Sequence, residues 1–178
     1  MSGIFVIAEL EGAIAGRIRA LQERFDPKLA AELPPHVTVI GSSGAGPVAP
    51  DTPVETIRSA VARVATGTPP ITLRFGRPMR FLQREIVVLP LDPHGPLRTL
   101  HERLKDADLP YAAARWPFTP HCTLSFYPTL TAESLRLLLG VREEAEWTLS
   151  MLRVYHSRDP QPPVLLFDAP LTGARTLS

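Results

Sequence analysis

The chain lacks the residues and segments that several architectures need. Its 178 residues include one cysteine, Cys122, which excludes an internal disulfide and a cysteine-based zinc cluster and fits a reducing compartment. No stretch approaches the roughly 18 apolar residues of a membrane-spanning helix. The apolar segment 4–8 has no basic region before it and no cleavage site after it, so it predicts a first strand and no signal peptide. We therefore expect a cytoplasmic protein that does not contact a membrane.

An excess of one charge sign is also lacking. The sequence has 19 Lys and Arg against 18 Asp and Glu, a formal net charge of +1. Sequence-independent binding of long nucleic acid depends on many neutralised phosphates and usually shows as a strongly basic domain. We expect no tight non-specific binding of nucleic acid, so a nucleic-acid ligand would be a nucleotide or a chain end. With 44% hydrophobic and 21% charged residues, the composition is that of a soluble globular protein, and we expect a monomer.

Apolar periodicity predicts alternating strands and helices in the first half of the chain. Alternation with a period of two indicates a strand, and apolar spacing of three and four residues indicates a helix. The expected order is strand 4–10, helix 12–25, strand 36–40, a Gly/Ser/Pro-rich loop 41–50, helix 53–65, and strands 71–81 and 86–91 joined by a turn near Gln83 and Arg84.

The second half repeats this order from strand 86–91 onward. Helix 96–107, strand 121–127, helix 131–140 and strands 146–157 and 164–170 follow. The repetition predicts an internal duplication within a single domain, residues 1–178, of two pseudo-symmetric lobes (about 1–85 and 86–178). The expected fold is α+β, a duplicated two-lobe arrangement with antiparallel sheets lining a central groove and helices outside.

A short motif occurs once in each half. The segments "LPPHVTVIG" (33–41) and "FTPHCTLSF" (118–126) both contain Pro-His-x-Thr followed by an aliphatic residue. Alternate side chains of a strand share a face, so His36 and Thr38 are expected on one face. By the same rule, the groove face of the second strand carries His121, Thr123, Ser125 and Tyr127, with Cys122 behind them as an inert buried thiol. A single such tetrapeptide indicates only an ordinary strand, but its duplication predicts a shared site between the lobes.

Two histidines and two threonines suit phosphoryl transfer. Imidazoles have an ordinary pKa near 6.5, so one can act as a general base while the other acts as a general acid. Threonine hydroxyls beside them can donate hydrogen bonds to non-bridging phosphate oxygens. Such a site needs no cofactor, and a histidine-only metal site is disfavoured because neither motif has a third ligand.

The other candidate residues fit two interpretations each. Tyr127 could stack on a nucleobase or cover the rim of the core. His94 and His101 are expected to face solvent, and His156 could line the groove at a strand end. Loop arginines that could clamp a phosphate or be solvated charges are Arg84, Arg115 and Arg158.

The paired motifs resemble those of the 2H phosphoesterases, which include the bacterial 2′-5′ RNA ligase and RNA 2′,3′-cyclic phosphodiesterase group. The resemblance depends on "PHVTV" and "PHCTL", their spacing of 85 residues, the opening "FVIA" and the approach "WPFTPHCTL". It implies a bilobal α+β fold in which His36 and His121 are the catalytic pair and Thr38 and Thr123 bind the phosphate.

The resemblance also implies a reaction. It suggests metal-independent hydrolysis of a 2′,3′-cyclic phosphate, on a nucleotide or RNA end, to a 2′-phosphate, with His121 activating water and His36 protonating the leaving 3′ oxygen. The sequence departs from the pattern at Phe126, where many members carry a basic residue, and at "GSSGAG" (41–46), where an aromatic segment is usual.

Several substrates and two other functions stay open. The substrate could be an RNA end, a cyclic nucleotide, a cyclic dinucleotide or a nucleotide-sugar cyclic phosphate. A non-catalytic nucleotide- or RNA-binding module of the same fold is one alternative, although binding alone does not need a second proton-transfer group. RNA 2′-5′ ligation is the other, and the small net charge disfavours it for long RNA.

Overall fold

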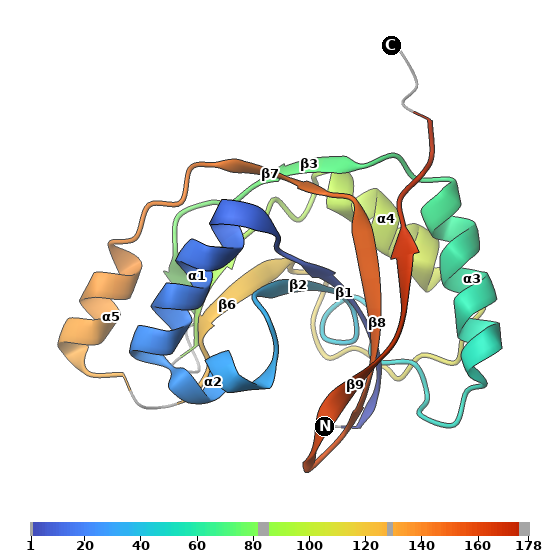
Figure 1. Cartoon of the computed structure of the whole chain (residues 1–178), viewed down its shortest axis with the longest axis horizontal. Coiled ribbons are helices and arrows are strands. Elements are labelled where there is room, and N and C mark those ends of the chain that lie inside the picture. The colour runs from blue at the N-terminus through green and yellow to red at the C-terminus, as the bar shows by residue number, and fades with distance from the viewer. Residues whose placement is uncertain (1, 82–85, 128–129, 175–178) are drawn as a thin grey trace.

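The structure, a computed structural model, describes residues 2–81, 86–127 and 130–174 (Figure 1). Its helices are α1 (Gly12–Phe25), α2 (Pro27–Glu32), α3 (Val54–Thr66), α4 (Pro96–Lys105) and α5 (Ala132–Leu139). Its strands are β1 (Gly3–Glu9), β2 (His36–Ile40), β3 (Ile71–Arg74), β4 (Met79–Arg80), β5 (Val87–Pro90), β6 (His121–Ser125), β7 (Glu146–Leu149), β8 (Met151–Arg158) and β9 (Gln161–Pro170).

Antiparallel pairing organises the strands into two sheets. The larger sheet has seven strands in the order β4-β5-β6-β2-β1-β8-β9, and the smaller one pairs β3 with β7. Figure 1 shows α1, α2 and α5 at one end of the molecule and α3 and α4 at the other. The predicted α+β class with antiparallel sheets is confirmed.

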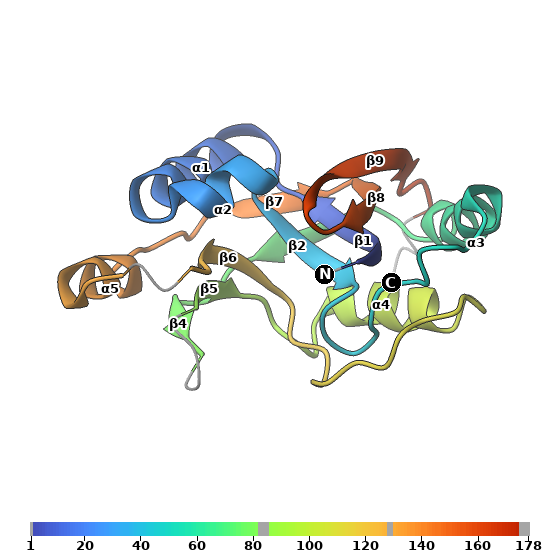
Figure 2. The same cartoon turned by 90° about the horizontal axis from the view of Figure 1, so that it is seen from below.

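The two motif strands lie at the centre of the larger sheet. β2 and β6 run side by side in the middle of the molecule (Figure 2), flanked by β1 and β5 respectively. Helix α1 packs against β6, and α4 packs against β2. Beyond these pairs, β8 lies next to β1 and β4 lies next to β5. Strands are thus exchanged between the sequence halves, and a division into lobes near residue 85 stays a prediction.

Several strand boundaries differ from those expected. The segment 71–81 is broken between β3 and β4, where Pro78 has no N–H for a ladder and Gly76 N–H bonds to the Pro90 carbonyl at 2.8 Å. Segment 146–157 is interrupted at Ser150, so that β7 joins the small sheet and β8 the large one. The last strand begins at Gln161 instead of 164. The expected turn near Gln83 and Arg84 lies outside the described residues.

Strand alternation in the motifs follows the prediction. Val37 and Val39 are buried, and His36 and Thr38, which alternate with them, are half-buried. Burial alternates in the same way along β6 from His121 to Leu124. Cys122 is fully buried, as expected, and burial raises the pKa of its thiol to about 12.

A short helix, α2, was not predicted. It begins after Asp26, whose carboxylate accepts a hydrogen bond from Leu29 N–H at 3.0 Å, with Pro27 at the first helical position. Aspartate followed by proline is a common helix start, so this signal was present in the sequence. In the described part of the chain, no helix is long and apolar enough to cross a membrane.

Candidate active site

The register of β2 and β6 brings the two motifs together. Val37 pairs with Cys122 in this antiparallel ladder. Extending the register by one residue each way places His36 opposite Thr123 and His121 opposite Thr38. Directly opposite Cβ atoms are about 4.5–5.5 Å apart and diagonal neighbours about 7–8 Å, so the two histidines stand across a diagonal of this four-residue group.

Each motif histidine is oriented by the same main-chain contact. Nδ1 of His36 lies 2.7 Å from the Pro34 carbonyl oxygen, and Nδ1 of His121 lies 2.7 Å from that of Thr119. A carbonyl only accepts, so each Nδ1 carries hydrogen and donates. Nε2 is therefore the nitrogen of each ring that takes up and releases a proton.

Burial favours the neutral form of both imidazoles. It lowers the pKa of His36 and of His121 from the usual 6.5, and the nearby His121 lowers the pKa of His36 further. The Phe81 ring meets the His121 ring edge-on, with 5.2 Å between centroids. One apolar neighbour thus helps to hold His121 in place.

A cavity of about 610 Å³ opens beside the motifs. His36, Thr38 and Thr123 line it, together with Tyr127 and Tyr155, whereas His121 is not among its lining residues. Within the described residues, neither threonine hydroxyl has a hydrogen-bond partner in the protein. Both hydroxyls are available to a ligand.

Of the two further candidates on β6 and just after it, Tyr127 lines the cavity and Ser125 does not. Tyr127 lines the cavity, and its hydroxyl donates to Glu32. Ser125, expected on the groove face, is fully buried, and its hydroxyl lies 3.4 Å from the Asp26 carboxylate. The strand ends at this point, so the period-two prediction does not extend to Ser125.

Asp26 and Gln22 hold the second motif strand from outside the motif. Asp26, 1% exposed, accepts hydrogen bonds from the N–H groups of Phe126 at 2.7 Å and Tyr127 at 3.0 Å. Gln22 donates to the Thr123 carbonyl at 2.8 Å. Both residues were missed, although Gln22 continues the helical spacing of Ile14 and Ile18 on the buried face of α1.

His101 forms a comparable contact with the first motif strand. Its Nδ1 donates to the Val39 carbonyl at 2.7 Å, and its ring stacks on Phe118 with 3.9 Å between centroids. The side chain is fully buried, so the expectation that His101 faces solvent was wrong. Leu97, Leu100, His101 and Leu104 share the buried face of α4, a spacing that was readable in the sequence.

The remaining candidates among the described residues do not line the cavity. His94 is exposed, as expected. His156 is buried, accepts a hydrogen bond from Arg158 at 3.2 Å and does not line the cavity. Arg115 and Arg158 are exposed and do not line it either, whereas Arg84 is outside the described residues.

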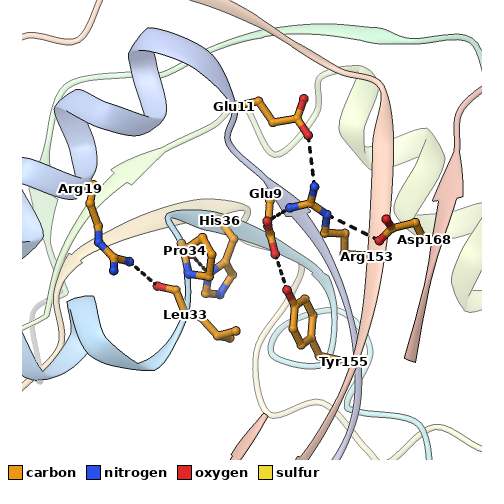
Figure 3. A network of polar contacts seen from close by, with 9 residues as sticks. All are labelled: Glu9, Glu11, Arg19, Leu33, Pro34, His36, Arg153, Tyr155 and Asp168. Carbon is orange, nitrogen blue, oxygen red and sulfur yellow. Dashed lines mark hydrogen bonds and ion pairs between the residues drawn. The ribbon is translucent and has the colours of Figure 1, made fainter. Parts of the chain in front are cut away.

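An ionic cluster borders the first motif on the neighbouring strands (Figure 3). Glu9 pairs with His36 across β1 and β2 and accepts a hydrogen bond from the Tyr155 hydroxyl at 2.6 Å. Arg153 contacts Glu9, Glu11 at 3.4 Å and Asp168 at 3.5 Å. Within residues 2–81, 86–127 and 130–174, no three His, Cys, Asp or Glu side chains gather closely enough to hold a metal ion.

The fold and the paired His-x-Thr strands define the class of the 2H phosphoesterases. The family model of the 2′-5′ RNA ligase superfamily matches residues 10–161, and the chain belongs to this superfamily. None of the curated proteins matches the chain.

Solved structures share the fold over nearly the whole chain. TT0787 of Thermus thermophilus is 18% identical with a TM-score of 0.67, covering 98% of this chain and 100% of that one. Escherichia coli LigT complexed with ATP is 19% identical with a TM-score of 0.63, covering 96% and 98%. LigT complexed with 3′-AMP is 16% identical with a TM-score of 0.56 over the same shares. At these identities the likeness concerns the fold alone.

Proposed function

We propose that this protein is a metal-independent phosphodiesterase that hydrolyses a 2′,3′-cyclic phosphate, on a nucleotide or an RNA end, to a 2′-phosphate. The observation that carries the proposal is the group of two histidines and two threonines formed by the β2–β6 register. In this group each histidine has its Nε2 free of the main-chain contact that fixes its ring.

The proton transfers divide between the two rings. Neutral His121 accepts a proton from water at Nε2 while the water oxygen attacks phosphorus. The P–O3′ bond breaks, and protonated His36 gives its Nε2 proton to the 3′ oxygen. The product carries a 2′-phosphate and a free 3′-hydroxyl. His121 then releases its proton to solvent and His36 takes one up, which restores the starting protonation states.

The protonation states suit this assignment. Burial lowers the pKa of His121, which keeps the base neutral near neutral pH. Burial also lowers the pKa of His36, but an anionic phosphate beside it favours the charged imidazolium. Thr38 and Thr123 donate to the non-bridging oxygens, where negative charge builds up in the transition state.

The complexes of LigT support a nucleotide ligand. Crystal structures of LigT contain ATP, NADP+, 3′-AMP or phosphate. The cavity beside the motifs combines aromatic side chains with the phosphate-binding hydroxyls. A mononucleotide with its phosphate between the motifs would use both features.

The test is a hydrolysis screen in EDTA. The substrates are the four 2′,3′-cyclic mononucleotides and an oligonucleotide ending in a cyclic phosphate, and chromatography identifies the product isomer. The expected result is a 2′-phosphate at a rate that EDTA does not change. A requirement for added divalent metal would contradict the proposal, and so would the absence of hydrolysis with all of these substrates.

RNA 2′-5′ ligation is the second candidate because the family is named for it. It follows the same course with a 5′-hydroxyl in place of water: the 5′ oxygen attacks the cyclic phosphate, the P–O3′ bond breaks, and a 2′-5′ phosphodiester forms. Incubating two such oligonucleotides with the protein tests it directly. A non-catalytic nucleotide-binding module would bind nucleotides but turn over neither set of substrates.

A further inference from the structure

Two tyrosines line the cavity, and the hydroxyl of each donates to a glutamate. Tyr155 on β8 donates to Glu9 on β1, and Tyr127, just after β6, donates to Glu32 at the end of α2. The two pairs are alike in composition. They differ in what else surrounds the carboxylate.

The Glu9 carboxylate is neutralised and enclosed. Its side chain is 5% exposed and forms an ion pair with Arg153 in addition to the hydrogen bond from Tyr155. A ligand in the cavity therefore meets no available acceptor there.

The Glu32 carboxylate is open. Glu32 is exposed and lines the cavity, and no lysine or arginine of the described chain forms an ion pair with it. A carboxylate offers about four lone-pair positions, of which Tyr127 uses one. The cavity thus presents a negatively charged acceptor that can take two further hydrogen bonds.

The Tyr127 ring beside it is held in place on several sides. Lys28 Nζ lies 3.9 Å from the ring centroid, and the Phe126 ring approaches edge-on at 5.2 Å between centroids. The Tyr127 N–H is bound by Asp26 at 3.0 Å. Lys28 covers one face of the ring, so a base would stack on the opposite face, where little freedom is lost on binding because the ring is fixed.

We propose that Tyr127 and Glu32 form a base-binding subsite that selects guanine, with the base stacked on Tyr127 and its Watson–Crick edge turned to Glu32. Guanine presents two adjacent donors, N1–H and the 2-amino group, which a carboxylate can bind together. Adenine and cytosine place a ring-nitrogen acceptor beside their amino group, and uracil has one N–H between two carbonyl oxygens. Each of these would set an acceptor against the carboxylate. The inference depends on the proposed function, since it takes a nucleotide as the ligand.

The test is calorimetric binding of nucleoside 2′-monophosphates, the expected products, which separates base selection from catalysis. Guanosine 2′-phosphate should bind about ten-fold or more tightly than adenosine 2′-phosphate, as for a bidentate base contact. Inosine 2′-phosphate keeps N1–H but lacks the 2-amino group, so its affinity should fall between the two.

Substitution of Glu32 gives the sharper result. Glu32→Gln offers one acceptor and one amide donor, which match the adenine edge, so the preference should move from guanosine to adenosine 2′-phosphate. If Glu32 only supported the fold, its substitution would weaken the binding of both nucleotides equally. Tyr155→Phe, which removes the hydroxyl that donates to Glu9, should keep the guanosine preference. Glu144→Gln, at an exposed position away from the cavity, controls for the loss of one surface charge.

Equal affinity of the wild type for guanosine and adenosine 2′-phosphates would overturn the inference, as would an unchanged preference in Glu32→Gln. A protein that binds guanosine 2′-phosphate selectively but hydrolyses no cyclic phosphate would keep this inference and reject the proposed reaction. Hydrolysis of all four cyclic nucleotides with no base preference would keep the proposed reaction and reject the guanine subsite.

Discussion

Val37 on β2 pairs with Cys122 on β6, and through this pair each motif histidine stands opposite the threonine of the other motif. Neither half of the chain therefore holds all four residues of the proposed proton-transfer and phosphate-binding group. This interdependence determines what should happen when single motif residues are changed.

Removal of either histidine should abolish most of the activity. His36→Ala or His121→Ala is expected to lower the hydrolysis rate of a 2′,3′-cyclic nucleotide by about 10²–10⁴-fold, the usual effect of a lost general acid or base. The double variant should be little worse than either single one, because residues that act as a unit are not additive. Steady-state rates measure this. Substantial activity in the double variant would show that the mechanism is wrong.

Replacement of a motif threonine should affect turnover more than stability. Thr38→Val and Thr123→Val keep the shape of the side chain but delete the hydroxyl donor. Each should raise the barrier by about 3 kcal/mol, as for a lost oxyanion donor, which corresponds to about a hundred-fold lower kcat. Thermal melting is expected to change little, since neither hydroxyl bonds to another described residue. A normal kcat in both variants would exclude the proposed phosphate contacts.

The pH dependence of kcat/KM should be a bell displaced toward acid. Activity rises with pH as the base loses its proton and falls as the acid loses its own. Burial lowers the pKa of both His36 and His121 from 6.5, so both limbs for the free enzyme are expected below that value. Bound phosphate stabilises imidazolium, so the falling limb of kcat should lie at higher pH than that of kcat/KM. A profile of kcat/KM centred well above neutral pH would contradict this.

The Asp26→Asn variant should loosen the end of β6 and the Tyr127 ring. An asparagine cannot accept at both carboxylate oxygens, so the N–H groups of Phe126 and Tyr127 would lose a charged acceptor. We expect the free energy of unfolding to fall by about 1.5–3 kcal/mol, from the usual value of hydrogen bonds to charged groups. Urea unfolding measures this, with the exposed Asp51→Asn as the control. KM for the nucleotide should rise more than kcat falls, and equal stability of the two variants would refute the role of Asp26.

His101→Leu should lower stability and its pH dependence together. The substitution leaves the Val39 carbonyl without its donor, at a cost of about 1–3 kcal/mol. Burial lowers the pKa of His101 in the folded protein, so its stabilising effect is full above the unfolded pKa of about 6.5 and is lost as pH falls. Between neutral and acidic pH, the melting temperature of the wild type should therefore fall more than that of the variant. Parallel curves would mean that His101 does not titrate on unfolding.

The sequence predicted the motif residues well because their environment is local. Two-residue alternation alone places His36 and Thr38 on one face of a strand, and the structure has this pattern. It could not predict where the strand stops: Asp26, a hundred residues earlier, binds the N–H groups that follow Ser125 and ends the alternation.

Contacts between distant segments explain the other misses. Gln22 and His101 each bond to a carbonyl of the motif strand in the other half, and no periodic pattern encodes such a contact. Their burial, in contrast, was readable, because both occupy positions that continue an apolar helical face. The break at Ser150 divides the segment between two sheets, β7 in the small one and β8 in the large one, and this division is a property of the whole fold.

The central β2–β6 ladder can also be described in terms of symmetry. It has the form of an isologous interface contained within one chain, and a site on such an axis would be the same from either side. The residues around the motifs differ between the two sides. Gln22 bonds to one motif strand and His101 to the other. The Glu32 carboxylate lines the cavity, whereas that of Glu9 is buried in an ion pair with Arg153. This broken symmetry gives the site a direction. Equivalent histidines can then differ as donor and acceptor of a proton, and an asymmetric ligand can bind in a single orientation.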